Sequence, residues 1–147
     1  MNCKTCFFIG NRHTPNSIKE KLVEAIETHI VEYGVTNFTV GHYGNFDGMV
    51  HSVLREAKKQ HTDIKLYLLC PYALNQKIDI PESFDGTFYP EGLEKVPLRL
   101  VIPQANKYMV QNSNYLITYC HHVGNTRNIV EYAQKLEKNG LIKITLL

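Results

Sequence analysis

The chain has 147 residues, of which 44% are hydrophobic and 20% charged, and its formal net charge at pH 7 is +2. This length suits a single domain, residues 1–147, with a sizeable hydrophobic core. The small net charge and the scattered lysines and arginines argue against a nucleic acid as the partner. No apolar run approaches the roughly 18 residues of a membrane-spanning helix, so we expect no membrane partner.

The N-terminal stretch MNCKTCFFIGNRHTP does not have the pattern of a secretory signal. It has at most four apolar residues in a row and no small-residue cleavage site. We therefore expect a cytoplasmic protein.

Cysteines stand at positions 3, 6, 70 and 120. Cys3 and Cys6 form a C-x-x-C motif at the start of an apparent strand, where side chains three residues apart face opposite sides. No second pair follows at zinc spacing. We therefore expect reduced, partly buried cysteines in place of a metal or redox site.

Residues 5–10, TCFFIG, are a short apolar run ended by a glycine, which predicts a buried parallel strand. Ser17 and Glu20 have the spacing of a capping box, and Gly34 predicts the end of the helix that they begin. The apolar face of this helix is formed by Ile18, Leu22, Ile26 and Ile30.

Residues 38–59, FTVGHYGNFDGMVHSVLREAKK, predict a strand, a turn that contains Gly41 and Gly44, and an amphipathic helix. Such a turn brings a helix N-terminus and free backbone N–H groups to the end of a strand, which suits an anion. We expect Asn45 to cap the helix and Asp47 to lie in its first turn. Asp47 has two interpretations: it complements the helix dipole, or it accepts a hydrogen bond from a ribose hydroxyl beside the turn.

Residues 63–70 predict a third strand, which Pro71 ends. Five of the six prolines fall between positions 71 and 103, where no sustained hydrophobic period is present. This composition excludes long helices and interior strands and predicts an irregular insertion, typical of a lid or a binding loop. Pro103 then predicts the start of a short helix.

Residues 114–119 and 141–147 predict the fourth and fifth strands. Between them a loop with Gly124 precedes a helix that we expect Thr126 to cap and Gly140 to end.

Strands that alternate with helices predict an α/β fold: a three-layer sandwich with a five-stranded, mainly parallel sheet. Right-handed crossovers leave few strand orders, and we expect the order 3-2-1-4-5. Strands one and four then lie side by side at the switch point, where such folds bind ligands. The loops at residues 10–14, 41–47 and 120–126 are expected to converge there on one crevice.

The chemistry of these loops favours binding over catalysis. Arg12 suits a phosphate group, although it is also compatible with an ordinary surface position. The histidines in the loops are not at metal-ligand spacing, and no nucleophile elbow is present. The four loop histidines are His13, His42, His121 and His122.

Four segments of the chain resemble the YpsA-like branch of the SLOG superfamily, the Rossmann-like relatives of DprA and the Lonely Guy proteins. FFIGNR resembles the F-x-x-G-H-R opening of that branch, and GHYGNFDGMVHSVLREAKK is similar to its G-x-x-G-x-F-D motif and following helix. FYPEGLEKVPLRLVIPQANKYMVQNSNYLITY is similar to its tyrosine–proline segment, R-N-x-x-M-V helix and fourth strand. GNTRNIVEYAQK stands in the place of its G-G-T or G-G-A loop.

The resemblance implies a Rossmann-like fold with a pocket for a nucleotide or nucleotide-derived ligand, a sensor or signalling role, and a homodimer. The residues that match are Gly10, Arg12, Gly41, Gly44, Asp47, Asn106, Met109, Gly124 and Thr126. The family pattern is not kept at Asn11, Ala105, Gln111, Asn114 and Asn125. Arg127 and Asn128 stand where the phosphoribohydrolase members have a glutamate, which argues against that enzyme.

The loops and the resemblance together define the candidate ligand-binding set. Its members are Gly10, Asn11, Arg12, His13, Gly41, His42, Gly44, Asn45, Asp47, Asn106, Gly124, Asn125 and Thr126. We predict no catalytic residue, no metal and no cofactor beyond a nucleotide-type ligand. Two alternatives stay open: a nucleotide N-glycosidic hydrolase that uses Asp47, and a degenerate scaffold that binds another protein.

Overall fold

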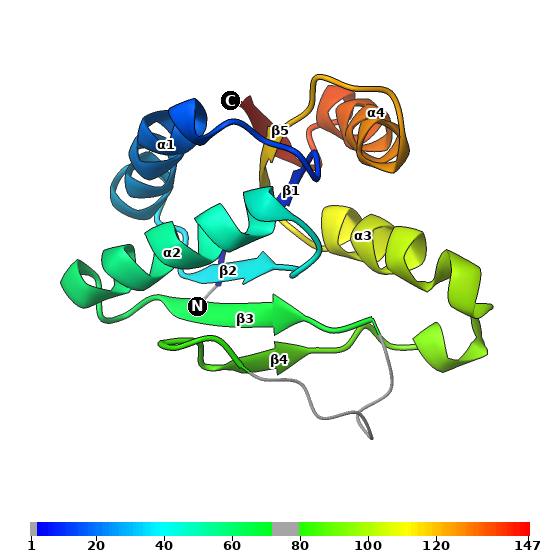
Figure 1. Cartoon of the computed structure of the whole chain (residues 1–147), viewed down its shortest axis with the longest axis horizontal. Coiled ribbons are helices and arrows are strands. Elements are labelled where there is room, and N and C mark those ends of the chain that lie inside the picture. The colour runs from blue at the N-terminus through cyan, green and yellow to red at the C-terminus, as the bar shows by residue number, and fades with distance from the viewer. Residues whose placement is uncertain (1–2, 72–79) are drawn as a thin grey trace.

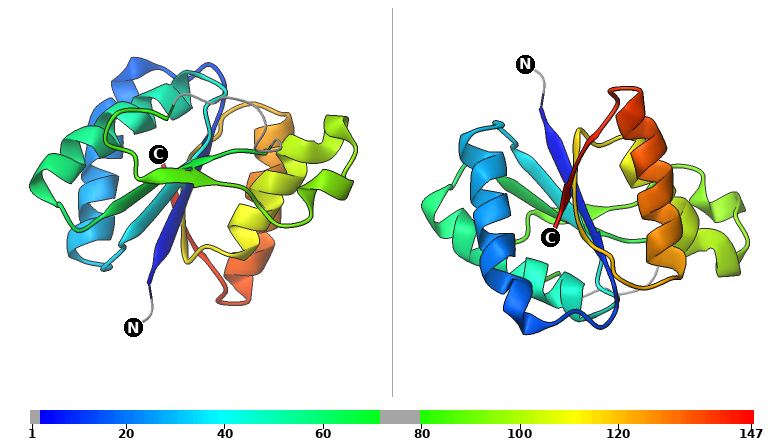
Figure 2. Two further views of the ribbon diagram at one scale, coloured as in Figure 1. Left: turned by 90° about the horizontal axis from the view of Figure 1, so that it is seen from below. Right: turned by 90° about the horizontal axis from the view of Figure 1, so that it is seen from above.

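The computed structural model describes residues 3–71 and 80–147. It is an α/β fold in which a parallel sheet is flanked by helices on both faces (Figures 1 and 2). The predicted fold class is therefore confirmed. No helix in the described part of the chain is long and apolar enough to cross a membrane.

The sheet has six strands in the order β4-β3-β2-β1-β5-β6, and every neighbouring pair is parallel. The strands are β1 (Thr5–Gly10), β2 (Asn37–Val40), β3 (Lys65–Leu69), β4 (Gly86–Phe88), β5 (Tyr115–Tyr119) and β6 (Lys143–Leu146). The order of the five predicted strands is correct, but their number is wrong. The missed strand β4 has only three residues, too few for a hydrophobic period to reveal it.

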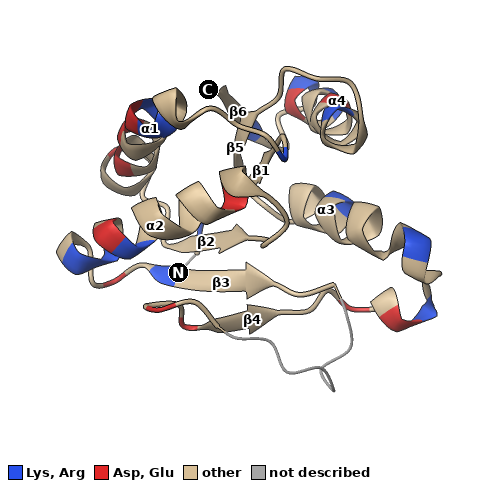
Figure 3. Cartoon of the chain, in the orientation of Figure 1, with Lys and Arg blue, Asp and Glu red and all other residues tan. Residues whose placement is uncertain are grey.

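Helices cover both faces of the sheet (Figure 2). Helices α1 (Lys19–Val31) and α2 (Asn45–Gln60) pack on one face, and α3 (Val101–Gln111) and α4 (Asn125–Lys138) pack on the other. Successive side chains of the central strands point to opposite faces, so that Phe8 and Ile117 enter the first core while Phe7 and Leu116 enter the second. Basic and acidic residues both occur along α1, α2 and α4, whereas α3 has no acidic residue (Figure 3).

Three predicted helix caps are wrong. Helix α1 is preceded by a short 3₁₀ helix at Asn16–Ile18, and no side-chain cap forms at its start. The N-caps of α2 and α4 are Gly44 and Gly124, again without a side-chain cap. The side chains expected at these caps, those of Asn45 and Thr126, instead hydrogen-bond the loop after β1 and the end of β1. A tertiary partner has replaced the local one in both cases.

The described part of the proline-rich segment, residues 71 and 80–103, contains β4 and two 3₁₀ helices, Leu93–Lys95 and Leu98–Leu100. Residues 72–79, the remainder of the predicted insertion, lie outside the described residues. Helix α3 begins at Val101, two residues before Pro103.

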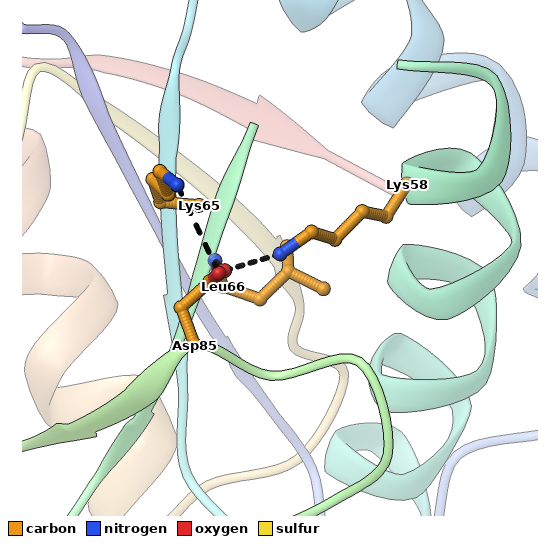
Figure 4. A network of polar contacts seen from close by, with 4 residues as sticks. All are labelled: Lys58, Lys65, Leu66 and Asp85. Carbon is orange, nitrogen blue, oxygen red and sulfur yellow. Dashed lines mark hydrogen bonds and ion pairs between the residues drawn. The ribbon is translucent and has the colours of Figure 1, made fainter. Parts of the chain in front are cut away.

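One carboxylate fastens the turn before β4 to its neighbours. Asp85 accepts hydrogen bonds from the Lys58 ammonium group of α2 and from the backbone N–H of Leu66 in β3 (Figure 4). Lys65 lies 4.0 Å from the same carboxylate. The edge strand is thus held to a helix as well as to the sheet.

Candidate functional site

A cavity of about 380 Å³, which we call the crevice, lies at the carboxyl ends of β1 and β2. Its walls come from β1, from the loops after β1, β2 and β5, from the first turns of α2 and α4, and from α3. The predicted residues that line it are Gly10, Asn11, Arg12, Gly41, Gly44, Asp47, Asn106, Gly124, Asn125 and Thr126. The structure therefore brings together ten of the thirteen candidates.

The topology explains why these distant segments meet. Strand β1 pairs with β5 so that Gly10 lies opposite Tyr119, and both strands end at the same edge of the sheet. The chain leaves β1 toward α1 on one face and leaves β5 toward α4 on the other (Figure 1). The two departing loops separate at this point and leave an opening, as at the switch point of other open α/β sheets.

Three predicted residues do not line the crevice. His13 is exposed, and the His42 ring stacks on the Tyr43 ring with 4.5 Å between centroids. The Asn45 amide is occupied elsewhere: its Oδ1 accepts the Thr14 N–H at 2.7 Å, and its Nδ2 donates to the Thr14 carbonyl at 2.6 Å. Asn45 therefore holds the loop after β1 against α2.

Arg12 is an exposed residue on a firmly held backbone. Its Nε donates to the Tyr43 carbonyl at 3.0 Å, and its own carbonyl accepts the Asn45 N–H at 3.1 Å. A Cβ added at Gly44 would lie 2.9 Å from the Arg12 Cα, closer than folded proteins tolerate. Glycine at position 44 thus lets the two loops touch and sets Arg12 at the crevice wall.

Asp47 is a buried carboxylate in the crevice wall, with 9% of its surface exposed. Burial raises its pKa from 3.8 to about 6, although the hydrogen bond from the Tyr43 N–H, 2.9 Å long, opposes this rise. A Cβ at Gly41 would lie 3.3 Å from the same carboxylate oxygen. The position in the first turn of α2 is as predicted, but the burial exceeds what a simple interaction with the helix dipole requires.

Arg12 and Asp47 hold Tyr43 from two sides, one through its carbonyl and the other through its N–H. The loop from Gly41 to Gly44 is therefore fixed by the two charged side chains of the crevice. Any ligand that competes for either charge also acts on this loop.

Asn11 has a structural role in addition to lining the crevice. Its Oδ1 accepts the His121 N–H at 2.7 Å, and its carbonyl accepts the Thr14 hydroxyl at 2.6 Å. The Thr126 hydroxyl donates to the Gly10 carbonyl at 3.3 Å. The bonds from His121 and Thr126 join the loop after β5 and the start of α4 to the end of β1, and the bond from Thr14 closes the loop after β1.

Two helix N-termini open onto the crevice. Helices α2 and α4 begin next to Gly44 and Gly124, which line it, and neither helix has a side-chain cap. The N–H groups of a helix's first turn have no partners within the helix, and the dipole makes this end positive. The arrangement can accept an anion.

The sequence did not single out several apolar members of the crevice. Phe46 is 1% exposed, and a Cβ at Gly10 would lie only 2.3 Å from its Cγ. The position of Phe46 between two predicted site residues, Asn45 and Asp47, could have indicated that it lines the site. An apolar residue in a helix is ordinarily assigned to the core, so it was not singled out. Ile102 lies in the stretch that was predicted to be irregular, although the structure places it in the first turn of α3. Val123, 89% exposed, carried no pattern at all.

Histidines and cysteines show no arrangement for metal chemistry in residues 3–71 and 80–147, where no group of three or more metal-ligating side chains is close enough to hold an ion. His51 donates from Nε2 to the Gly41 carbonyl at 2.8 Å and so supports the turn. All four cysteines are free; Cys3 is exposed, whereas burial raises the pKa of the Cys6 thiol well above its usual value.

A scan against models of protein families finds none that matches this chain. A search of curated proteins finds no match either.

Proposed function

We propose that the crevice binds a nucleotide or nucleotide-derived ligand and that the protein acts as a sensor or signalling component of the SLOG superfamily, YpsA-like branch. The observation that carries the proposal is the meeting of two helix N-termini without side-chain caps, Arg12 and buried Asp47 around one cavity. Positive helix ends and a guanidinium favour a phosphate, while a carboxylate beside them favours a hydroxyl donor.

Each part of such a ligand has a matching wall. The phosphate is assigned to Arg12 and the N-terminus of α4, and the ribose hydroxyls to the Asp47 carboxylate. The base is assigned to the apolar side chains of Ile102 and Val123. The cavity volume, about 380 Å³, is within the roughly 300–1,000 Å³ typical of small-molecule sites.

A second candidate function is hydrolysis of a nucleotide N-glycosidic bond. It is favoured by the raised pKa of Asp47, about 6, because a carboxyl group that titrates near the working pH can accept and return a proton. The attacking water would lose a proton to Asp47 as its oxygen bonds to C1′ of the ribose. The bond between C1′ and the base nitrogen would break, and the proton on Asp47 would pass to the departing base. Chromatography can measure the release of free base from nucleoside monophosphates. If the base is released and Asp47→Asn abolishes the release, the protein is a hydrolase and not only a binding protein.

A thermal-shift screen tests the binding proposal directly. Mononucleotides, cyclic nucleotides, NAD and ADP-ribose are added to the full chain one by one. A ligand present at about 100 times its dissociation constant should stabilise the folded state by roughly 2.7 kcal/mol and raise the Tm by several degrees.

The variants distinguish a site in the crevice from binding elsewhere. Arg12→Ala should reduce the Tm increase, whereas Arg99→Ala, a matched change at an exposed arginine outside the crevice, should not. A Tm increase that is equal in both variants would assign the phosphate to the α4 N-terminus alone. No increase with any ligand at millimolar concentration would overturn the proposal and favour a scaffold that binds another protein.

A further inference from the structure

A second cavity, of about 410 Å³, lies over one face of the sheet beside the last turn of α3. We call it the sheet-face groove, defined chiefly by Asn37, Thr39, Tyr67, Thr87, Tyr108 and Asn112. It shares no lining residue with the crevice. It is therefore a separate feature of the molecule.

The groove lies where none of the helices in residues 3–71 and 80–147 packs over this half of the sheet face. Phe7 of β1 lies beside Thr39 of β2, and Thr39 lies beside Tyr67 of β3. Phe7 is part of the core under α3 and α4, but the same row continues as a threonine and a half-buried tyrosine. Parallel sheets normally carry apolar residues on both covered faces, so this polar continuation marks an open surface.

The lining is neutral and has unused hydrogen-bonding capacity. None of the described residues that line the groove is charged. The hydroxyls of Thr39 and Tyr67, which share one face of the sheet, have no hydrogen-bond partner in the described part of the chain. Thr39 is only 3% exposed as a residue, yet it lines the groove, so a molecule bound there can hydrogen-bond its unpaired hydroxyl.

Aromatic rings supply the second kind of contact. Tyr67, Phe88 and Tyr108 all line the groove, and the rings of Phe88 and Tyr108 lie 5.9 Å apart at 33°. Such rings pack against the flat face of another ring. A neutral lining gives no compensation for the charge of a phosphate.

We propose that the sheet-face groove binds a neutral ring compound rich in hydroxyl or amide groups, of the sugar or unphosphorylated nucleoside class. The ring packs on the tyrosines, and its polar groups hydrogen-bond Thr39 and Asn37. This site is independent of the nucleotide proposed for the crevice.

Saturation-transfer NMR on the full chain tests the proposal. The probes are methyl α-glucoside and N-acetylglucosamine for sugars, adenosine and uridine for nucleosides, and AMP as the charged comparison. At least one neutral probe should bind in the millimolar range. Tyr67→Ala and Thr39→Val should each weaken that binding fivefold or more, with folding checked by circular dichroism.

Two control variants assign the binding to this groove. Thr118→Val makes the same change at a buried strand threonine whose hydroxyl also lacks a partner but which does not line the groove, and it should leave affinity unchanged. Asp47→Asn in the crevice should also leave it unchanged. The proposal is overturned if no neutral probe binds at tens of millimolar, or if Asp47→Asn abolishes binding. Self-association that Tyr67→Ala abolishes would also overturn it, because the groove would then be an interface between two copies.

Discussion

The environment of Asp47 makes the stability of the protein depend on pH. The pKa of Asp47 is about 6 in the folded protein and near 3.8 when exposed, so the folded state favours the protonated form. The stability that the folded state gains by holding Asp47 protonated is fully present below pH 4 and is lost as the pH rises through 6. At pH 7 the buried charge lowers the free energy of unfolding by roughly 3 kcal/mol, because a tenfold change in the protonation equilibrium corresponds to about 1.36 kcal/mol.

We expect Asp47→Asn to raise the free energy of unfolding at pH 8 by roughly 1–3 kcal/mol, because the amide oxygen can still accept the Tyr43 N–H without a buried charge. Urea unfolding at pH 5, 6, 7 and 8 measures the effect. The gain should shrink toward pH 5. Equal stability of the two proteins at pH 8 would contradict the raised pKa.

The same substitution separates stability from binding. If the carboxylate accepts a ribose hydroxyl, Asp47→Asn should weaken nucleotide affinity by roughly 1.5–3 kcal/mol while it stabilises the free protein. Calorimetric titration of the variant with the best ligand of the screen gives the answer. Unchanged affinity would assign Asp47 to the fold alone.

Gly10 is required by the packing of Phe46. A Cβ at position 10 would lie 2.3–2.6 Å from three atoms of the Phe46 ring, so Gly10→Ala must displace the ring. We expect a loss of roughly 1–3 kcal/mol in the free energy of unfolding. Gly48→Ala is the matched control: its Cβ has no neighbour within 4 Å and it lies in α2, so it should stabilise by roughly 0.5–1 kcal/mol. Equal effects of the two alanines would contradict this account.

At the scale of elements, Asp85 decides how firmly β4 is attached. Burial alone raises its pKa, but the hydrogen bonds from Lys58 and Leu66 and the charges of Lys58 and Lys65 outweigh it, so the pKa of Asp85 falls below its usual value. Because the pKa of Asp85 is lower in the folded protein than in the unfolded chain, Asp85 stabilises the fold at pH values above its pKa in the unfolded chain. This stability is lost as the pH falls through the pKa that Asp85 has in the folded protein.

We expect Asp85→Asn to lower the free energy of unfolding by about 0.5–1.5 kcal/mol at pH 7, because the ion pair is lost while one hydrogen bond can persist. Hydrogen exchange of the β4 amides should accelerate more than that of β1. At a pH well below 3.8 the variant and the parent should converge in stability. Uniform acceleration over the whole sheet would show that Asp85 does not act on β4 in particular.

At the scale of the whole molecule, the two hydrophobic cores depend on one sheet. Leu116 and Ile117 are adjacent in β5, yet the first packs under α3 and α4 and the second under α1 and α2. Both side chains are fully buried. Loss of either core therefore removes support from the same strands.

We expect Leu116→Ala and Ile117→Ala each to cost roughly 2–5 kcal/mol and to leave unfolding as one cooperative transition. Near-ultraviolet and far-ultraviolet circular dichroism should give the same midpoint for each variant. Two separated transitions in either variant would mean that the halves of the molecule unfold independently.

The sequence by itself determined the α/β class, the order of the five predicted strands and the edge at which the glycine-bearing loops meet. These features follow from local patterns: apolar runs ended by glycine or proline, helical spacing of apolar residues, and the handedness of crossovers. Gly10, Gly41, Gly44 and Gly124 identified the loops correctly, for more than one reason: at Gly44 the backbone of Arg12 approaches closely, whereas Gly124 has a φ of +148°, which favours glycine.

Only the tertiary structure decided how individual side chains are used. Asn45 and Thr126 have the chemistry of helix caps, but partners distant in sequence were available and were bound instead. The burial of Asp47 depends on the packing around it, and the row Phe7–Thr39–Tyr67 becomes visible only when three strands are in register. Local sequence cannot specify such contacts, because their free energy comes from residues distant along the chain, as with the 31 positions that separate Thr14 from Asn45.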